Sequence, residues 1–358
     1  MPPVRPNPAL SQRRPGKSRL KSCNECVQAK AKCNRERPAC SRCRVRGTDC
    51  EYGPRHENHE TPRDTEGQSV GTISLRWLAA MTQENSTPPR SKMLSQTTIY
   101  YCCRFLRTFP LQLAECPPFV HPTLRHQRAL ANATTLMNMV QVRAPGSESL
   151  VSQTVLSEMG AIMSSAALAA FQAYLLLTML VYFHLPSSKG MVTIETQLNI
   201  QSLADHAARL IPPVREEVRS RAEWVLSESL RRTIFTACVF DDTWNALNGI
   251  TVYVAEELGR LLAPGPRSLW TATASSWARE WEAYASAWAS PCMTVGRSGE
   301  PGLLLDELWG RGEMSDATRE ARTDHWVGHL DEFGAWILAI CEMSGSGRNG
   351  AHDTSNVY

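Results

Sequence analysis

Six cysteines within 28 residues constrain this chain more than any other feature of its sequence. They are Cys23, Cys26, Cys33, Cys40, Cys43 and Cys50. The gaps between them are two, six, six, two and six residues, so one unit, C-x2-C-x6-C, is written twice. Two tetrahedral zinc ions need eight metal–ligand bonds, and six thiolates supply eight only if two of them bridge. The symmetry of the repeat favours equivalent positions, Cys23 and Cys40, as the bridging pair. The sequence therefore predicts a binuclear cluster with two Zn²⁺ ions per chain.

Other uses of the six cysteines fit the sequence less well. Residues 1–16 are rich in Pro and Arg and contain no apolar core, so we expect no secretory signal and a reducing compartment. Clustered cysteines then indicate metal or redox chemistry rather than disulfides. Two separate four-ligand zinc sites would need eight ligands, and neither His56 nor His59 has an equivalent spacing. An iron–sulfur cluster is the remaining alternative, although so basic a surround does not favour it.

The charge of the chain is divided between its two ends. Residues 1–55 hold 14 Lys/Arg against four Asp/Glu, whereas the rest holds 24 against 31. A basic block ahead of a mildly acidic body indicates a polyanion partner for the N-terminal part, with nucleic acid as the first candidate. The basic string between Arg13 and Lys21 is typical of a nuclear import signal, and equally of a solvated tail that strengthens phosphate contacts.

The stretch CNECVQAKAKCNRERPACSRCRVRGTDCEY, from Cys23 to Tyr52, resembles the fungal six-cysteine binuclear zinc-cluster transcription factors. The resemblance includes Pro38 in the loop joining the two halves, where the family reverses the chain. It implies two short helices, starting near Cys23 and Cys40, related by a pseudo-two-fold axis. It also implies that the end of the first helix enters the major groove and reads a CGG-type triplet. The family's main reader is a lysine three residues before the third cysteine, which is Lys30 here.

General chemistry agrees with Lys30 as a base reader. Lys or Arg donating to O6 and N7 of guanine is the commonest specific contact in the major groove. A phosphate contact is the alternative role for Lys30. Family members often have a second basic residue directly before the reader, where this chain has Ala29. We expect phosphate contacts and charge balance from the neighbouring basic residues, which are Lys32, Arg35, Arg37, Arg42, Arg44 and Arg46.

Composition and periodicity divide the chain into five parts. We expect a basic disordered tail (1–22), the zinc module (23–50), a linker (51–91), an all-α regulatory domain (92–343) and a disordered tail (344–358). The linker shows no heptad repeat, so a monomer and a homodimer formed through the helical body both stay open. Within the body the periodicity predicts helices at 92–115, 148–184, 195–211, 215–247, 272–289, 300–312 and 316–343.

The segment Ala166–Phe183 is interrupted only by Gln172 and Thr178. Its length is at the lower limit for crossing a bilayer, and no Lys/Arg cluster flanks it. We therefore expect a buried central helix and no membrane, with a membrane tether as the alternative.

Three segments of the body add to the resemblance: Trp224–Thr233, Cys116–Pro122 and Leu330–Ala339. In the first of these, Glu228 and Arg232 are four residues apart, and an exposed helical pair of this kind contributes about 0.3–0.5 kcal/mol. We interpret the motif as structural. The adjacent cysteines 102 and 103 are interpreted as buried apolar residues. Four tryptophans recur at helical spacings, which is typical of core packing or, alternatively, of a pocket for an apolar effector; they are Trp270, Trp277, Trp281 and Trp288.

The sequence shows no convincing catalytic constellation. We therefore expect a nuclear, zinc-dependent, sequence-specific regulator of RNA polymerase II genes, and not an enzyme. Its partners would be double-stranded DNA and either a second copy or a co-regulator. The resemblance and the short body suggest control of a biosynthetic, secondary-metabolite gene cluster. The alternative is an enzyme or an effector-sensing helical domain that the zinc module tethers to DNA.

Overall fold

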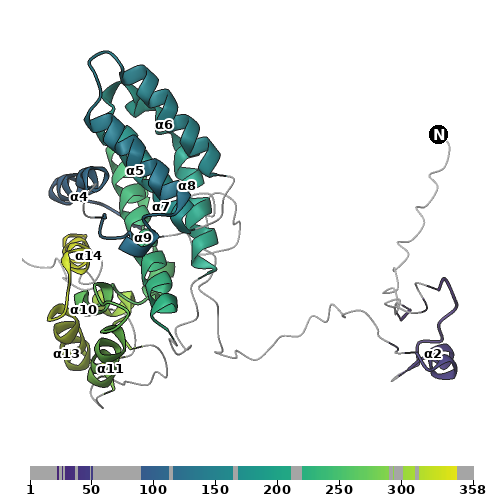
Figure 1. Ribbon diagram of the computed structural model, residues 1–358. Coiled ribbons are helices and arrows are strands. Elements are labelled where there is room, and N and C mark those ends of the chain that lie inside the picture. The colour runs from purple at the N-terminus through teal and green to yellow at the C-terminus, as the bar shows by residue number, and fades with distance from the viewer. Residues whose placement is uncertain are drawn as a thin grey trace, which may run out of the picture. The chain divides into compact units, whose positions relative to one another are not determined.

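The computed structural model divides the chain into two compact units, Met1–Glu66 and Gly67–Tyr358 (Figure 1). The described residues are 22–23, 26, 29–36, 39–48, 50, 90–112, 116–163, 168–210, 220–289, 293, 301–310 and 314–344. Almost all of the expected tails (1–22 and 344–358) and linker (51–91) therefore lie outside them, and the five domain boundaries stay predictions.

The small unit contains the helix α2 (Ser41–Arg46). Cys40 is its N-cap, and the sulfur of Cys40 accepts a hydrogen bond from the backbone N–H of Cys43. Gly47 ends the helix in the left-handed conformation, at φ 63°, and the N–H of Thr48 donates to the carbonyl of Cys43. A left-handed residue, followed by a hydrogen bond to the carbonyl five residues back, is a common way to end a helix. The expected helix near Cys40 is confirmed.

The first half of the zinc module repeats this backbone pattern. Cys26 is helical, and the N–H of Ala31 donates to the carbonyl of Cys26 at 2.9 Å. The residue before Ala31 is Lys30, which has a φ of 46°. Lys30 thus stands where Gly47 stands in the second half, so the two-fold repeat of the sequence appears in the backbone as well.

The larger unit is a helical body, as expected from the periodicity. Its two short strands, β1 (Ser91–Lys92) and β2 (Val252–Tyr253), pair antiparallel with Ser91 opposite Tyr253. The α-helices are α4 (Gln96–Thr108), α5 (Arg128–Gln141), α6 (Glu148–Ile162), α7 (Leu168–His184), α8 (Ile194–Ala208), α9 (Arg221–Leu247), α10 (Arg267–Trp270), α11 (Trp277–Trp288), α12 (Leu305–Leu308), α13 (Asp316–Val327) and α14 (Glu332–Met343). The short 3-10 helices are η1 (Phe109–Leu111), η2 (Pro122–Leu124), η3 (Pro186–Met191) and η4 (Glu256–Arg260).

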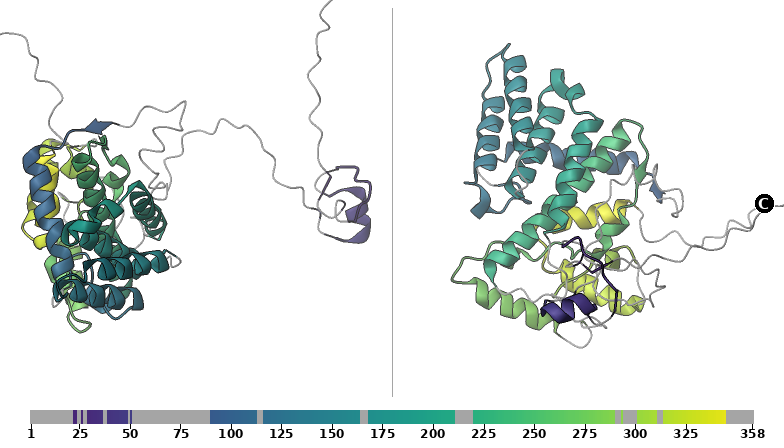
Figure 2. Two further views of the ribbon diagram at one scale, coloured as in Figure 1. Left: turned by 90° about the horizontal axis from the view of Figure 1, so that it is seen from above. Right: turned by 90° about the vertical axis from the view of Figure 1, so that its right-hand side faces the viewer.

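The helices of the body form two groups. Helices α5 to α8 lie together at one end, and α10, α11, α13 and α14 lie at the other (Figure 1). The right-hand view of Figure 2 shows the same separation, with the yellow C-terminal helices away from the blue-teal pair α5 and α6. The 27-residue helix α9 contacts α4, α7 and α8 as well as β2. It therefore connects the first group to α4 and to the short sheet.

Helix α7 is the centre of the first group. Every residue from Leu168 to Tyr182 is buried, and α7 packs against α4, α5, α6, α8 and α9. The amide of Gln172 donates to the Phe119 carbonyl and the Thr233 hydroxyl, so this polar break in the apolar run is hydrogen-bonded. The prediction of a buried central helix is confirmed. Among the described residues, no helix has the length and apolar character needed to cross a membrane.

Several expected boundaries in the body were wrong. The predicted helix at 148–184 is two helices, α6 and α7, and the described residues of 300–312, which are 301–310, contain only the four-residue α12. Helix α5 was missed altogether, because polar residues interrupt its periodicity. Thr134 and Thr135 donate to the carbonyls of Leu130 and Ala131 one turn back, which satisfies their hydroxyls within the helix.

A zinc-cluster site and its basic surround

The cysteine repeat folds into one compact group of sulfur atoms. Four sulfur atoms lie within 4.8 Å of one another and belong to buried residues, which are Cys23, Cys26, Cys40 and Cys43. Cys33 and Cys50 are half-buried and pack against these four. The six cysteines predicted as metal ligands are therefore brought together.

The sulfur separations have the value that zinc requires. A Zn–S bond is about 2.3 Å, so the edge of a tetrahedron of sulfurs around zinc is about 3.8 Å. Four sulfur pairs lie at this distance: Cys23–Cys40, Cys23–Cys43 and Cys33–Cys23 at 3.8 Å, and Cys26–Cys40 at 3.7 Å. The donor set therefore fits zinc in both chemistry and size.

Two sulfurs in this group connect the halves of the repeat. Cys23 lies at the tetrahedral edge distance from Cys33 of its own half and from Cys40 and Cys43 of the other. Cys40 lies at that distance from both Cys23 and Cys26 of the first half. These distances favour Cys23 and Cys40 as the shared ligands, although the role of each cysteine stays a prediction.

Hydrogen bonds to sulfur hold the group in place. The backbone N–H of Cys40 donates to the sulfur of Cys50 at 3.2 Å, and that of Cys43 donates to the sulfur of Cys40 at 3.4 Å. The guanidinium of Arg42 donates to the sulfur of Cys26 at 3.8 Å. Such outer contacts orient metal ligands and stabilise their charged form.

Burial also affects the protonation of these thiols. It raises the pKa of Cys43 to about 11 and moves the pKa of Cys23 well above its ordinary value. A thiol with a raised pKa is neutral at pH 7, whereas zinc binds the thiolate. Zinc must therefore displace protons as it binds, and zinc affinity falls as the pH falls.

The basic residues predicted to contact DNA separate into two sets. Lys30, Lys32, Arg35 and Arg46 are exposed, and no hydrogen bond or ion pair joins their side chains to the described part of the module. Arg42 is half-buried on the cysteine group, and Arg44 donates to the Glu36 carboxylate and the Ala39 carbonyl. Arg37 and Pro38, which the sequence also singled out, lie outside the described residues.

Two of the exposed basic residues have an unfavourable backbone conformation. Lys30 has a φ of 46° and Arg35 a φ of 60°, and they are the only non-glycine residues with positive φ in the described part of the chain. A side chain makes the left-handed region costly, and residues held there are concentrated at functional sites. Both residues were predicted as DNA contacts. Aligning the two repeats, which places Lys30 opposite Gly47, is the signal that could have revealed the first of them.

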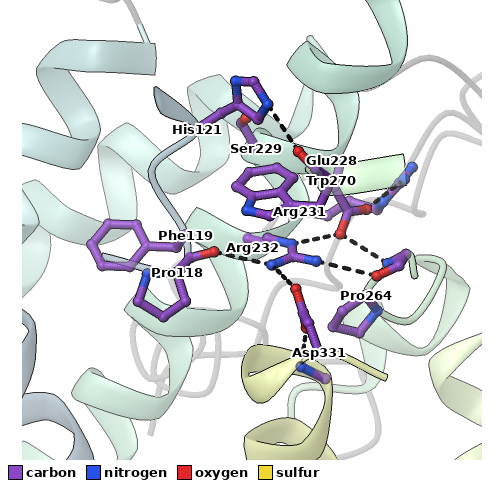
Figure 3. A network of polar contacts seen from close by, with 12 residues as sticks. Pro118, Phe119, His121, Glu228, Ser229, Arg231, Arg232, Pro264, Trp270 and Asp331 are labelled. Carbon is purple, nitrogen blue, oxygen red and sulfur yellow. Dashed lines mark hydrogen bonds and ion pairs between the residues drawn. The ribbon is translucent and has the colours of Figure 1, made fainter. Parts of the chain in front are cut away.

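The Trp224–Thr233 motif forms a buried ionic network (Figure 3). Glu228 accepts from Arg232 at 2.6 Å and from Arg231 at 2.9 Å, and Arg232 also meets Asp331 at 2.6 Å. The side chains of Glu228 and Arg232 are fully buried, so the value for an exposed pair does not apply. Removing one partner of a buried ion pair lowers the free energy of unfolding by about 3–5 kcal/mol.

The network joins four segments that are far apart in the sequence. Arg232 donates to the carbonyls of Pro118 and Gly265, and its guanidinium lies 4.1 Å from the centre of the Trp270 ring. With Asp331 these contacts connect α9 to the Pro118 segment, the Gly265 loop and the start of α14 (Figure 3). Burial raises the pKa of Glu228, but the two arginines outweigh it, and the net pKa lies below its ordinary value. The geometry supports the structural interpretation of the motif.

The tryptophans take part in packing. Trp277 and Trp281 stack with their ring centroids 5.5 Å apart, and they pack with Trp224 in a small apolar cluster. Trp288 belongs to the main core, and Trp270 covers Arg232. These contacts favour core packing over a pocket for an effector.

The comparisons with known proteins agree with the cysteine geometry. Residues 21–58 match the model of the Fungal Zn(2)-Cys(6) binuclear cluster domain. The chain therefore carries a domain of this class, which binds two zinc ions through six cysteines.

Relatives of the chain are named as regulators of gene clusters. The chain is 39% identical over 85 residues to Pestheic acid cluster transcriptional regulator 2 of Pestalotiopsis fici, covering 20% of this chain and 19% of the relative. It is 51% identical over 47 residues to the Trypacidin cluster transcription factor of Aspergillus fumigatus, covering 13% and 12%. It is 55% identical over 31 residues to the Geodin cluster transcription factor of Aspergillus terreus, covering 9% and 14%. The alignments thus span less than a fifth of these relatives, and no solved structure matches.

Proposed function

We propose that the chain is a zinc-dependent, sequence-specific DNA-binding regulator of transcription. The observation that carries this proposal is the two-zinc domain at residues 21–58, which presents four exposed basic side chains without partners in its described part. A positive surface on a small metal-held module suits the phosphate backbone of DNA. The class is a fungal one, so the proposed site of action is the nucleus and the proposed targets are RNA polymerase II genes.

In this proposal the six cysteines hold the zinc ions, with Cys23 and Cys40 as the shared ligands. The tetrahedral edge distances around these two sulfurs support the assignment. Zinc supplies no reaction here; its role is to fix the short backbone segments that carry the DNA contacts.

Lys30 reads guanine in a CGG-type triplet. Three features support this role: Lys30 is exposed, it precedes Ala31, whose N–H donates to the carbonyl of helical Cys26, and it keeps a backbone conformation that suits glycine better. Its ammonium group can donate to O6 and N7 of guanine in the major groove. Lys32, Arg35 and Arg46 then contact phosphates, and Arg37 joins them by its sequence position.

The regulated genes form a biosynthetic cluster, most simply one for a secondary metabolite. The support is that the relatives named above are regulators of such clusters. Deleting the gene should lower or raise the transcripts of one set of adjacent biosynthetic genes. Unchanged transcripts in every biosynthetic cluster would refute this part of the proposal.

The helical body serves regulation, through a second copy of the chain or a co-regulator, and not catalysis. Its conspicuous charged group, around Glu228 and Arg232, is fully enclosed and paired, which suits a structural role. The mass of the zinc-loaded chain in solution, with and without DNA, distinguishes a homodimer from a monomer that recruits another protein.

Random-site selection with the full chain tests the DNA-reading role. The wild type should recover a CGG-type triplet at a stated salt concentration. Lys30→Ala should lose that triplet while keeping weak, salt-sensitive binding. Arg46→Gln is the matched control, because it should keep the triplet, weaken binding to all sequences and lower the salt slope by about one. Recovery of the same triplet by Lys30→Ala would refute the assignment.

A further inference from the structure

Arg42 differs from the other basic residues of the zinc module in where its side chain lies. It is half-buried, and its Nη1 atom lies 3.8 Å from the sulfur of Cys26. Cys26 is 1% exposed and belongs to the other half of the cysteine repeat. Arg42 therefore reaches from α2 across to a predicted zinc ligand of the first half. Arg46, on the same helix, is exposed and has no such contact in the described part of the module.

The charge of the cluster gives this contact a consequence. Six thiolates around two divalent ions leave a net charge of −2, and a thiolate bound to one ion keeps more negative charge than a shared one. A hydrogen bond from a guanidinium is charge-assisted, and it stabilises the thiolate against release from the metal. Among the described side chains, that of Arg42 is the charged group that donates to a cluster sulfur.

We propose that Arg42 is a positioning residue of the zinc cluster: it stabilises the Cys26 thiolate on its zinc ion and does not contact a DNA phosphate. This inference rests on the proposed two-zinc assignment and not on DNA binding. It differs from the sequence-based expectation, which assigned phosphate contacts and charge balance together to Arg42 and its basic neighbours.

The sequence provides this hydrogen bond for Cys26 but not for its counterpart Cys43 in the second half of the repeat. Superposing the two units of the repeat places Glu25 opposite Arg42 and Cys26 opposite Cys43. An ionised carboxylate donates no hydrogen bond, so Glu25 cannot give Cys43 the bond that Arg42 gives Cys26. Cys43 is also 1% exposed, which makes it a matched internal comparison. The Cys26 thiolate should therefore react with an electrophile more slowly than the Cys43 thiolate.

The first test measures zinc transfer from the full-length chain to a chromophoric chelator, without DNA. Arg42→Gln should transfer zinc about tenfold faster than the wild type, the lower end of the range for outer contacts of a metal site. Arg42→Lys keeps the positive charge but loses the planar guanidinium group. Its rate of zinc transfer should therefore lie between those of the wild type and Arg42→Gln. Arg46→Gln should match the wild type. Wild-type rates in both Arg42 variants would overturn the proposal.

The second test identifies the sulfur that Arg42 affects. N-ethylmaleimide is applied briefly to the zinc-loaded full chain, and each cysteine's labelling is measured by mass spectrometry. In the wild type Cys26 should label more slowly than Cys43, and Arg42→Gln should raise Cys26 alone to the rate of Cys43. An equal rise at both cysteines would overturn the proposal, because it would show general loosening of the module.

DNA binding distinguishes a role of Arg42 in positioning Cys26 from a role as a phosphate contact. Arg42→Gln that is fully loaded with zinc should keep the wild-type salt slope of DNA affinity, whereas a phosphate contact would lower the slope by about one. A lowered slope with unchanged zinc transfer would make Arg42 a phosphate contact. Failure of the wild type itself to bind DNA would leave the zinc-transfer result intact, so the proposed function and this inference fail separately.

Discussion

The equivalent positions of Lys30 and Gly47 allow the backbone cost of the side chain that we propose as the DNA reader to be measured. Each residue precedes an N–H that donates to a carbonyl five residues back, and both have positive φ, 46° and 63°. A Cβ at Gly47 would meet nothing within 4 Å, so a side chain there would be penalised by its backbone conformation and not by a clash. The zinc module therefore contains the strained position and its relaxed counterpart in one small fold.

The expected effect of Lys30→Gly follows from two opposing contributions. Relieving a left-handed conformation gains about 1–2 kcal/mol, and the greater freedom of glycine in the unfolded chain costs about 0.4–1 kcal/mol. The net gain is about 0.5–1 kcal/mol. Because zinc binding and folding of such a module are coupled, this gain appears as a two- to fivefold rise in zinc affinity.

The assay is competition for zinc between the full chain and a chelator of known affinity. Lys30→Gly should bind zinc two- to fivefold more tightly than the wild type, and Gly47→Ala should bind it more weakly by a similar factor. Lys30→Ala is the control, because it removes the ammonium group but keeps the Cβ and the strain. Both Lys30 variants should lose the selected DNA triplet.

Equal zinc affinities for Lys30→Gly and Lys30→Ala would contradict this prediction. That result would mean that the left-handed backbone at Lys30 carries no cost, or that the module changes shape to avoid it. Both variants could lose the triplet while Lys30→Gly alone binds zinc more tightly. That result would show that lysine at this position lowers stability but is needed for recognition of DNA.

Two further predictions concern protonation and the helical body. At pH 7, below the ordinary thiol pKa of about 8.5 and below the pKa of about 11 at buried Cys43, zinc addition should release protons, as measured by calorimetry in two buffers, because zinc binds the thiolate. No proton release would contradict binding of zinc through the cysteines. Glu228→Gln should lower the free energy of unfolding of the body by about 3–5 kcal/mol in urea, because it removes the buried carboxylate that Arg231 and Arg232 share. The control Arg209→Gln removes the exposed pair with Asp205 and should cost less than 1 kcal/mol; equal losses in the two variants would contradict the role of the network.

The zinc site was predictable from the sequence because cysteine spacing and metal stoichiometry restrict it so strongly. What the sequence left open was the direction of each basic side chain. Arg42, Arg44 and Arg46 alternate along one short segment, and composition alone cannot show that Arg42 lies against the cysteine group while Arg44 pairs with Glu36 at the surface. The left-handed backbone at Lys30 was also unexpected, because this conformation usually occurs at glycine and the position holds a lysine.

In the body, features that depend on neighbouring residues were predictable, and contacts between residues far apart in the sequence were not. The buried helix α7 was predictable from a continuous apolar run, and the spacing of Glu228 and Arg232 predicted that they would meet. The third member, Asp331, lies 99 residues beyond Arg232, and no local pattern connects them. The pairing of β1 with β2 joins segments about 160 residues apart and was missed for the same reason.

Zinc content and DNA selection, measured on one sample of the full chain, test whether two bound zinc ions create the DNA-reading module. Zinc is added stepwise to the metal-free chain, and bound zinc per chain is compared with selective binding of the recovered triplet over a scrambled duplex. We predict two zinc ions per chain, with selective binding that rises to completion at the second ion and is abolished by a chelator. One ion or none per chain, or selective binding that persists in the chelator, would contradict it.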